Sequence, residues 1–298
     1  MGRTRDLLAE ALCALSTTDG SLKWVSDMVN HSGRQDALAC NMLPAIVDGT
    51  AVVADTVGGV YRVSLEDGSL LWRAPPATSS AEFGESSGRG VHLSTASMAV
   101  GPNGLVFHGF NLRKGAGAVR AHELAGGAVR WAREFDEEVN AAPAVGPAGP
   151  GGRLAVVVAL GRNPIDERPE WWDWLYWQQG LRPGIQTSVV ALDAETGDRL
   201  WTFAGPAWYG NVPNKDQISC LPDTWGSPSI GSDGTVYLNW SGGVAFAVRD
   251  VDEDGVVDWK NPEETSFHFH GYGTNGASAI APGFVVAANC VQVLAWTS

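Results

Sequence analysis

Short apolar segments alternate with polar turns along the chain, and a glycine and a tryptophan recur at a fixed distance in these turns. In five segments a glycine stands four residues before a tryptophan, as in TDGSLKW and ETGDRLW. The pairs are Gly20–Trp24, Gly68–Trp72, Gly127–Trp131, Gly197–Trp201 and Gly255–Trp259. Apolar alternation on both sides of a polar turn predicts a β-hairpin whose glycine adopts a positive φ.

A second strand–turn–strand pattern precedes each hairpin, as in PAIVDGTAVVADT from Pro44 and PSIGSDGTVYLNW from Pro228. The repeat tryptophans are separated by 48 to 70 residues, which fits units whose connections differ in length. One hairpin cannot bury its own tryptophan, so the units must stack. The sequence therefore predicts an all-β fold, a β-propeller of four-stranded antiparallel blades that forms a single domain over residues 1–298.

The segment ALDAETGDRLW, residues 191–201, resembles the repeat of the pyrroloquinoline-quinone-type propellers. That family includes quinoprotein alcohol dehydrogenases and a non-catalytic outer-membrane assembly lipoprotein. The resemblance covers about residues 12–296, and it implies that the repeat tryptophans dock between neighbouring blades. It indicates the fold and not the activity, because one fold hosts several functions.

The number of blades depends on how the two ends of the chain are used. Complete units end at Trp72, Trp131, Trp201 and Trp259, whereas the N-terminus supplies a final hairpin and the C-terminus three strands. Joined in one composite blade, the two fragments give about five blades. Family members have seven or eight, so the alternative is a truncated part of a larger ring. This alternative is favoured because ALCALS and VQVLAW compete for the same strand position.

Composition narrows the possible partners. The net charge of −13 repels phosphate backbones, so we expect no nucleic-acid partner. Charged residues make up 18% of the chain and hydrophobic residues 44%, which is enough for a sizeable core. No apolar run is long enough to span a membrane, and Asp6 and Glu10 interrupt the N-terminal apolar segment, so we identify no signal peptide.

The sharpest chemical signal is DVDEDGVVDW, in which carboxylates alternate before a glycine turn. Such spacing converges oxygen atoms on a hard cation, as at the start of a calcium-binding loop. The predicted metal ligands are Asp250, Asp252, Asp254, the carbonyl of Val256 and Asp258. The position of the usual bidentate glutamate is Asn261, so Glu263 or Glu264 would have to replace it. The alternative is an ordinary solvated acidic hairpin.

Aromatic residues mark a second candidate region. An aromatic-rich insertion lies at about residues 161–187, and propeller loops often carry function. The connections at 207–225 and 267–275 both precede the first strand of a unit and should project from one common face. The expected ligand or partner face contains Trp171, Trp172, Trp174, Trp177, Trp208, Tyr209, Trp225, His268, His270 and Tyr272. The insertion could instead pack its aromatics onto the propeller as a lid. His268 and His270 have no third ligand nearby in sequence, so solvated histidines are favoured over a metal pair.

The four cysteines, Cys13, Cys40, Cys220 and Cys290, form no CxxC pair. Disulfides between Cys13 and Cys40 or between Cys220 and Cys290 remain possible. They would indicate an oxidising, extracytoplasmic compartment, which the sequence otherwise leaves open.

Two functions fit the sequence. Quinoprotein dehydrogenases of the resembled family use a calcium-bound quinone, a catalytic aspartate and, in many members, a disulfide between adjacent cysteines. This sequence has no adjacent cysteine pair and no GxSxG motif, so no catalytic residue can be assigned. We therefore interpret the chain as a non-catalytic scaffold that binds a protein or glycan, with a possible calcium ion and without pyrroloquinoline quinone. The alternative is a divergent quinone-dependent oxidoreductase that acts on an alcohol or sugar.

Overall fold

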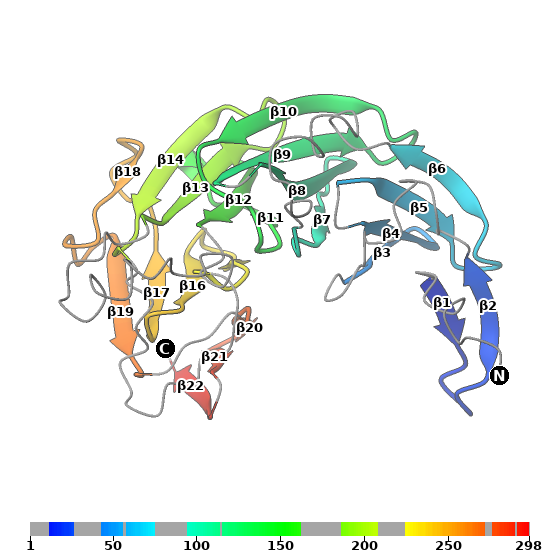
Figure 1. The fold of residues 1–298 in the computed structure, drawn as a ribbon. Coiled ribbons are helices and arrows are strands. Elements are labelled where there is room, and N and C mark those ends of the chain that lie inside the picture. Colours follow the sequence, from blue (N-terminus) through cyan, green and yellow to red (C-terminus); the bar gives the residue numbers. More distant parts are fainter. Residues whose placement is uncertain are drawn as a thin grey trace, which may run out of the picture.

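The computed structural model is built almost entirely from β-strands (Figure 1). It describes residues 12–26, 43–55, 58–74, 94–113, 115–161, 186–207, 224–271, 276–289 and 291–297. Within these ranges the only helical segment is the short 3-10 turn η1, Pro150–Gly152. None of the helical structure in these ranges is long and apolar enough to cross a membrane.

Four sheets contain the four strands of a complete blade, and we number these blades along the chain; the third also carries a fifth strand, β18 (Val256–Val257). The first blade contains β3 (Ala45–Val47), β4 (Thr50–Ala54), β5 (Val60–Ser64) and β6 (Leu70–Ala74). The second contains β7 (Met98–Val100), β8 (Leu105–Arg113), β9 (Ala116–Glu123) and β10 (Val129–Phe135). The third contains β11 (Ala144–Gly146), β12 (Ala155–Leu160), β13 (Ser188–Asp193) and β14 (Arg199–Ala204). The fourth contains β15 (Ser229–Ile230), β16 (Val236–Trp240), β17 (Val244–Val248) and β19 (Thr265–Phe269).

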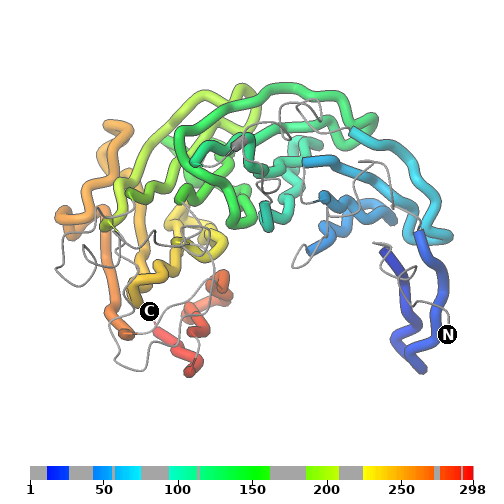
Figure 2. Tube along the Cα trace, viewed as in Figure 1, coloured from blue at the N-terminus to red at the C-terminus, as the bar shows by residue number. Residues whose placement is uncertain are grey.

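Two smaller sheets lie at the ends of the described chain. The first contains β1 (Leu12–Leu15) and β2 (Leu22–Ser26), and the second contains β20 (Ala279–Ala281), β21 (Phe284–Ala288) and β22 (Val293–Thr297). No strand of one sheet pairs with a strand of the other. Both ribbon and tube show them apart, at the two ends of an arc of blades (Figures 1 and 2). The structure therefore does not form the composite blade that the sequence allowed.

The antiparallel topology gives the propeller two different faces. Turns between first and second strands, and between third and fourth strands, leave one end of each blade, which we call the turn face; examples are 101–104 and 194–198. Connections between second and third strands, and from one blade to the next, leave the other end, the connection face. The strands β12 and β14 both end at the connection face, where the chain continues into residues 161–187 and 205–228.

Each repeat tryptophan of the first three hairpins fastens its sheet to the next one. The indole nitrogens of Trp24, Trp72 and Trp131 donate hydrogen bonds of 2.9, 2.8 and 3.1 Å to the carbonyls of Leu65, Leu124 and Ala194. In the same order, these rings lie over Gly68, Gly127 and Gly197, where a Cβ atom would be only 2.6 to 2.7 Å from a ring carbon. The expected docking of tryptophans between blades is confirmed for these three residues.

The glycines of all five motifs have positive φ, between 72° and 88°, as predicted. In each of the first four hairpins the register shifts between the two strands. The shift leaves one unpaired residue directly before the tryptophan. These unpaired residues are Lys23, Leu71, Arg130 and Leu200. A bulge of this kind redirects the following side chain, here toward the next blade.

Apolar clusters fill the junctions between consecutive blades, and one of them borders two buried histidines. His108 lies opposite Met98, which belongs to the cluster between the first and second blades. Its side chain is fully buried, and neither ring nitrogen has a hydrogen-bond partner. Burial, together with nearby His122 and Arg120, lowers the pKa of His108 to about 3. His108 is therefore neutral in the folded protein near neutral pH.

Replacement of Gly197 by alanine tests the fit between indole and glycine. Gly197→Ala places a Cβ against Trp131 and also strains a residue with φ of +72°. Gly104→Ala is the matched control, because Gly104 has φ of +74° but nothing within 4 Å of its Cβ position. We expect the control to lose about 1 kcal/mol of unfolding free energy and Gly197→Ala to lose about 1–3 kcal/mol more. Equal losses in urea unfolding would contradict the proposed steric role.

Buried His108 also predicts a pH dependence. In the unfolded chain His108 has a pKa of about 6.5 and binds a proton below that pH, whereas in the folded protein it stays neutral. The folded state therefore loses stability as pH falls below about 6.5. Between pH 7.5 and pH 5 this loss is about 2 kcal/mol. In urea unfolding at both values, His108→Leu should show a correspondingly smaller change than the parent. An unchanged pH dependence would show that His108 is not responsible.

Candidate functional site

The acidic loop, Asp250–Asp258, connects β17 to β19 at the turn face of the fourth blade. It contains β18 (Val256–Val257), which pairs in parallel with the outer strand β14 of the third blade, with Val256 opposite Thr202. The loop thus connects two strands of the fourth blade and forms hydrogen bonds with the outer strand of the third blade. In Figure 1 it lies at the outer edge of the arc.

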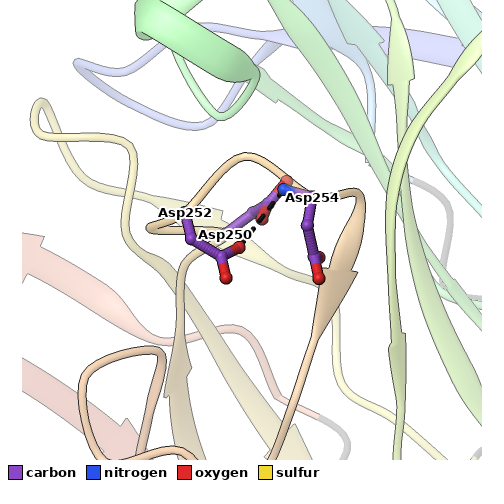
Figure 3. A group of neighbouring side chains, drawn as sticks. All are labelled: Asp250, Asp252 and Asp254. Atoms are coloured by element: carbon purple, nitrogen blue, oxygen red, sulfur yellow. Dashed lines mark hydrogen bonds between the residues drawn. The ribbon is translucent and has the colours of Figure 1, made fainter.

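Three carboxylates converge in this loop (Figure 3). One carboxylate oxygen of each of Asp250, Asp252 and Asp254 lies within 4.8 Å of the corresponding oxygens of the other two. Backbone donors hold the side chains in place: Gly255 N–H donates to Asp250 Oδ2 at 3.3 Å, and Val256 N–H donates to Asp254 Oδ1 at 2.7 Å. The alternating spacing therefore produces the predicted convergence.

A buried glutamate lies near this group. Glu264 is only 4% exposed, and its Oε2 accepts a hydrogen bond of 2.9 Å from the backbone N–H of Asp258. Glu264 Oε1 and Asp250 Oδ1 are both buried oxygens without a hydrogen-bond partner. Burial raises the pKa of Asp250, and the negative charges of Asp254, Asp252 and Glu264 raise it further. The loop thus concentrates negative charge that no cation balances among the described residues.

The other two predicted ligands lie apart from this group. Val256 belongs to β18, and Asp258 is not a member of the carboxylate group. Asp258 Oδ1 instead accepts a hydrogen bond of 2.9 Å from the backbone N–H of Lys260. The structure therefore brings together three of the five predicted ligand residues and adds buried Glu264 nearby.

The indole hydrogen bond differs at the junction of the third and fourth blades, although Trp201 still packs in the apolar cluster between them. The indole of Trp201 donates to Ala148 in its own blade at 2.6 Å, and not to a turn of the next blade. The acidic loop instead contacts the third blade: Thr202 N–H donates to Gly255 O at 3.0 Å, and Gly151 N–H donates to Glu253 Oε1 at 2.7 Å. Glu253 holds a φ of +61°, which is strained for a non-glycine residue.

The fifth motif therefore does not form the hairpin that the sequence predicted. The outer strand of the fourth blade is β19, which begins seven residues after Asp258, the last residue of the acidic loop. Trp259 lies in the turn before it and is 44% exposed, with the Lys260 ammonium 5.6 Å from its ring centre. The expectation that Trp259 docks between blades is wrong, because β18 pairs with the preceding blade instead.

Most of the aromatic residues proposed for the partner face lie outside the described residues. These are Trp171, Trp172, Trp174, Trp177, Trp208, Tyr209 and Tyr272. Trp225 is described and is only 2% exposed, packed against Phe203 and Phe246. Its side chain contributes to the core and not to an exposed rim.

His268 and His270 occupy different environments. His268 is exposed on β19, and its ring packs edge-on against Trp296 with the two ring centres 5.4 Å apart. His270 is 9% exposed, and its Nδ1 lies 3.3 Å from the side-chain nitrogen of Asn289. Burial and the charge of His268 lower the pKa of His270. Neither histidine joins a metal-ligating group among the described residues.

Cys13 is a free, exposed thiol. The other three cysteines lie outside the described residues.

A buried polar cluster at the connection face had no recognisable signal in the sequence. Asn111 Nδ2 donates to Asn140 Oδ1 at 2.7 Å, and the backbone N–H of Val139 donates to Asn111 Oδ1 at 2.9 Å. Glu138 Oε1 accepts a bond of 2.8 Å from Gly115 N–H. These contacts tie the β8–β9 turn to the connection that enters the third blade, and so stiffen the connection face.

Comparisons with known proteins agree with this architecture. A family model described as outer membrane protein assembly factor BamB matches residues 4–101. A search of curated protein sequences gives no match. The crystal structure of BamB from Moraxella catarrhalis aligns at 15% identity and a TM-score of 0.45, over 96% of this chain and 78% of that one.

Two dehydrogenases are also similar in structure. Quinohemoprotein alcohol dehydrogenase ADHIIG from Pseudomonas putida HK5 aligns at 16% identity and a TM-score of 0.54, over 93% of this chain and 48% of that one. Quinohemoprotein alcohol dehydrogenase from Comamonas testosteroni aligns at 15% identity and a TM-score of 0.47, over 84% of this chain and 40% of that one. This chain thus spans less than half the length of either dehydrogenase. The four-stranded blades and the structural similarity to ADHIIG together show that the chain has a β-propeller fold, and its first third matches the BamB family model.

Proposed function

We propose that the protein is a non-catalytic binding scaffold in which a calcium ion braces the junction between the third and fourth blades. The observation that carries this proposal is the acidic loop: three converging carboxylates and two unpartnered buried carboxylate oxygens, in a segment that spans two blades. A cation at this position would stiffen the loop that pairs with β14, at the one junction between complete blades where the indole N–H bonds within its own blade.

Calcium suits the chemistry of the loop. Calcium takes six to eight oxygen ligands in flexible geometry, and carboxylates and backbone carbonyls are its usual protein ligands. Asp250, Asp252 and Asp254 supply the core of such a site. Small movements of the loop would add the Val256 carbonyl and either Asp258 or Glu264. Binding would also offset the repulsion that raises the pKa of Asp250.

The connection face is the proposed partner surface. Loops carry function on rigid scaffolds, and the long connections of this propeller leave from that face. The family model that matches residues 4–101 is described as an outer membrane protein assembly factor, which favours a protein partner over a glycan. A glycan remains the alternative ligand of the aromatic-rich insertion.

The carboxylate group does not fit a quinone cofactor at the connection face. It lies at the turn face, on a loop that pairs with an outer strand, so a cation there could not hold a quinone among the long connections. The oxidoreductase alternative therefore has no metal centre among the described residues, and no catalytic step is derived for it.

Because the carboxylates of the acidic loop repel one another, the effect of Asp250→Asn on stability should have opposite signs with and without calcium. In chelator, Asp250→Asn removes one of three converging negative charges and can keep the hydrogen bond from Gly255 N–H. We expect the variant to gain a few tenths of a kcal/mol in stability without calcium and to be less stable than the parent when calcium is present. Thermal melts in both conditions test this expectation. A variant that is destabilised equally in both would contradict a charge-based role.

A second variant tests the calcium brace directly. Asp252→Ala should lower the melting temperature in calcium and abolish the difference between calcium and chelator, because it removes a ligand. Asp67→Ala is the control: Asp67 accepts a similar turn hydrogen bond from Ser69 N–H, but it lies outside the group. It should keep the full calcium effect.

A thermal melt of the parent protein with calcium and pyrroloquinoline quinone, with the visible spectrum recorded, distinguishes the scaffold proposal from the oxidoreductase alternative. The scaffold proposal expects stabilisation by calcium alone and no bound chromophore. An equal melting temperature of the parent protein in calcium and in chelator would refute the calcium proposal. A stoichiometric chromophore that raises the melting temperature would refute the non-catalytic assignment.

A further inference from the structure

The contact that attaches β18 to the third blade is small. β18 pairs with β14 through two residue pairs, Val256 with Thr202 and Val257 with Phe203, whereas β17 and β19 pair through five within the fourth blade. Val257 is 2% exposed and packs in the apolar cluster at this junction, but Val256 is 58% exposed. The attachment therefore depends on one buried side chain and a short run of backbone contacts.

The converging carboxylates hold the backbone of the residues that make this contact. Asp254 Oδ1 accepts the N–H of Val256, and Asp250 Oδ2 accepts the N–H of Gly255. Gly255 O in turn accepts the N–H of Thr202 on β14 at 3.0 Å. Two of the three carboxylates are thus linked to the third blade through one short backbone segment, so a change in their positions would move β18.

Two features of the acidic loop oppose this arrangement. Carboxylate oxygens of three aspartates lie within 4.8 Å of one another, and nearby Glu264 is 4% exposed, with an Oε1 that has no hydrogen-bond partner. Glu253, which accepts the N–H of Gly151 in the third blade, holds a strained φ of +61°. A cation among the carboxylates would offset the repulsion and so favour the geometry in which β18 is attached.

We propose that the cation of the acidic loop controls the attachment of β18 to β14. With the cation bound, the carboxylates converge and hold Gly255 and Val256 where β18 pairs with the third blade. Without the cation, repulsion favours a loop in which β18 leaves β14 and uncovers the outer edge of that strand. This inference rests on the calcium proposal, and it adds that calcium regulates whether this edge of the third blade is covered.

Hydrogen exchange resolved to single amides tests the inference in the parent protein. The reporter is the N–H of Thr202, which donates to Gly255 O. The control is the N–H of Gly197, which donates to Asp193 O and closes the turn of the same hairpin. We expect the Thr202 amide to exchange about tenfold faster in chelator than in calcium, and the Gly197 amide to change less than about twofold. Equal exchange of Thr202 in both conditions, or the same acceleration at Gly197, would overturn the inference.

A matched pair of variants tests the same coupling through calcium affinity. If calcium favours the attached loop, a change that weakens the attachment must also weaken calcium binding, because linkage is reciprocal. Val257→Ala shortens a buried side chain, and Val251→Ala makes the same change in the same loop at a side chain that is 46% exposed. Calorimetric titration with calcium chloride should show about tenfold weaker binding for Val257→Ala and less than about twofold for Val251→Ala. Equal affinities of the two variants would contradict the coupling.

The outcomes separate this inference from the calcium proposal. A parent protein that shows no calcium binding in the titration would refute both. Calcium binding without a change in the exchange of Thr202 would overturn only the control of β18 and would leave the calcium site in place. Because the exchange comparison uses the parent protein, it does not depend on how stably Val257→Ala folds.

Discussion

The contact between an indole and a bare glycine backbone sets the arrangement of the first three blades. Each ring covers a glycine in the next sheet and donates its N–H to a carbonyl three residues earlier in that turn. The glycine is required twice, because its φ is positive and because a Cβ would overlap the ring. A glycine and a tryptophan that are neighbours in one motif therefore serve two different junctions.

The junction between the third and fourth blades is built differently. The indole N–H of Trp201 bonds within its own blade, and the acidic loop reaches back from the fourth blade to pair with β14. The loop stores strain at Glu253 and places like charges together, both of which oppose folding. A bound cation would offset this repulsion and so stabilise the loop that pairs with the third blade. This is why the metal proposal and the architecture of this junction depend on one another.

Much of the candidate site followed from sequence spacing, and part of it did not. Alternation predicted that Asp250, Asp252 and Asp254 converge, because side chains on alternate residues of a tight loop point to the same side. Asp258 and Val256 were assigned to the same site, but β18 carries Val256 into a pairing with another blade. The burial of Glu264 is also a tertiary effect, since nothing in its neighbourhood in sequence distinguishes it from exposed Glu263.

The repeat pattern was sufficient to predict the class of fold and the positive-φ glycines, and the family resemblance implied the docking that Trp24, Trp72 and Trp131 show. These features depend on contacts that every repeat makes in the same way, so repetition reveals them. Only the tertiary structure decided that β18 joins the third blade, that β1–β2 and β20–β22 form separate sheets, and that Gly20 has no ring over it. Strand pairing between distant segments is a competition among similar hydrogen-bonding edges, and its outcome depends on which blade lies within reach.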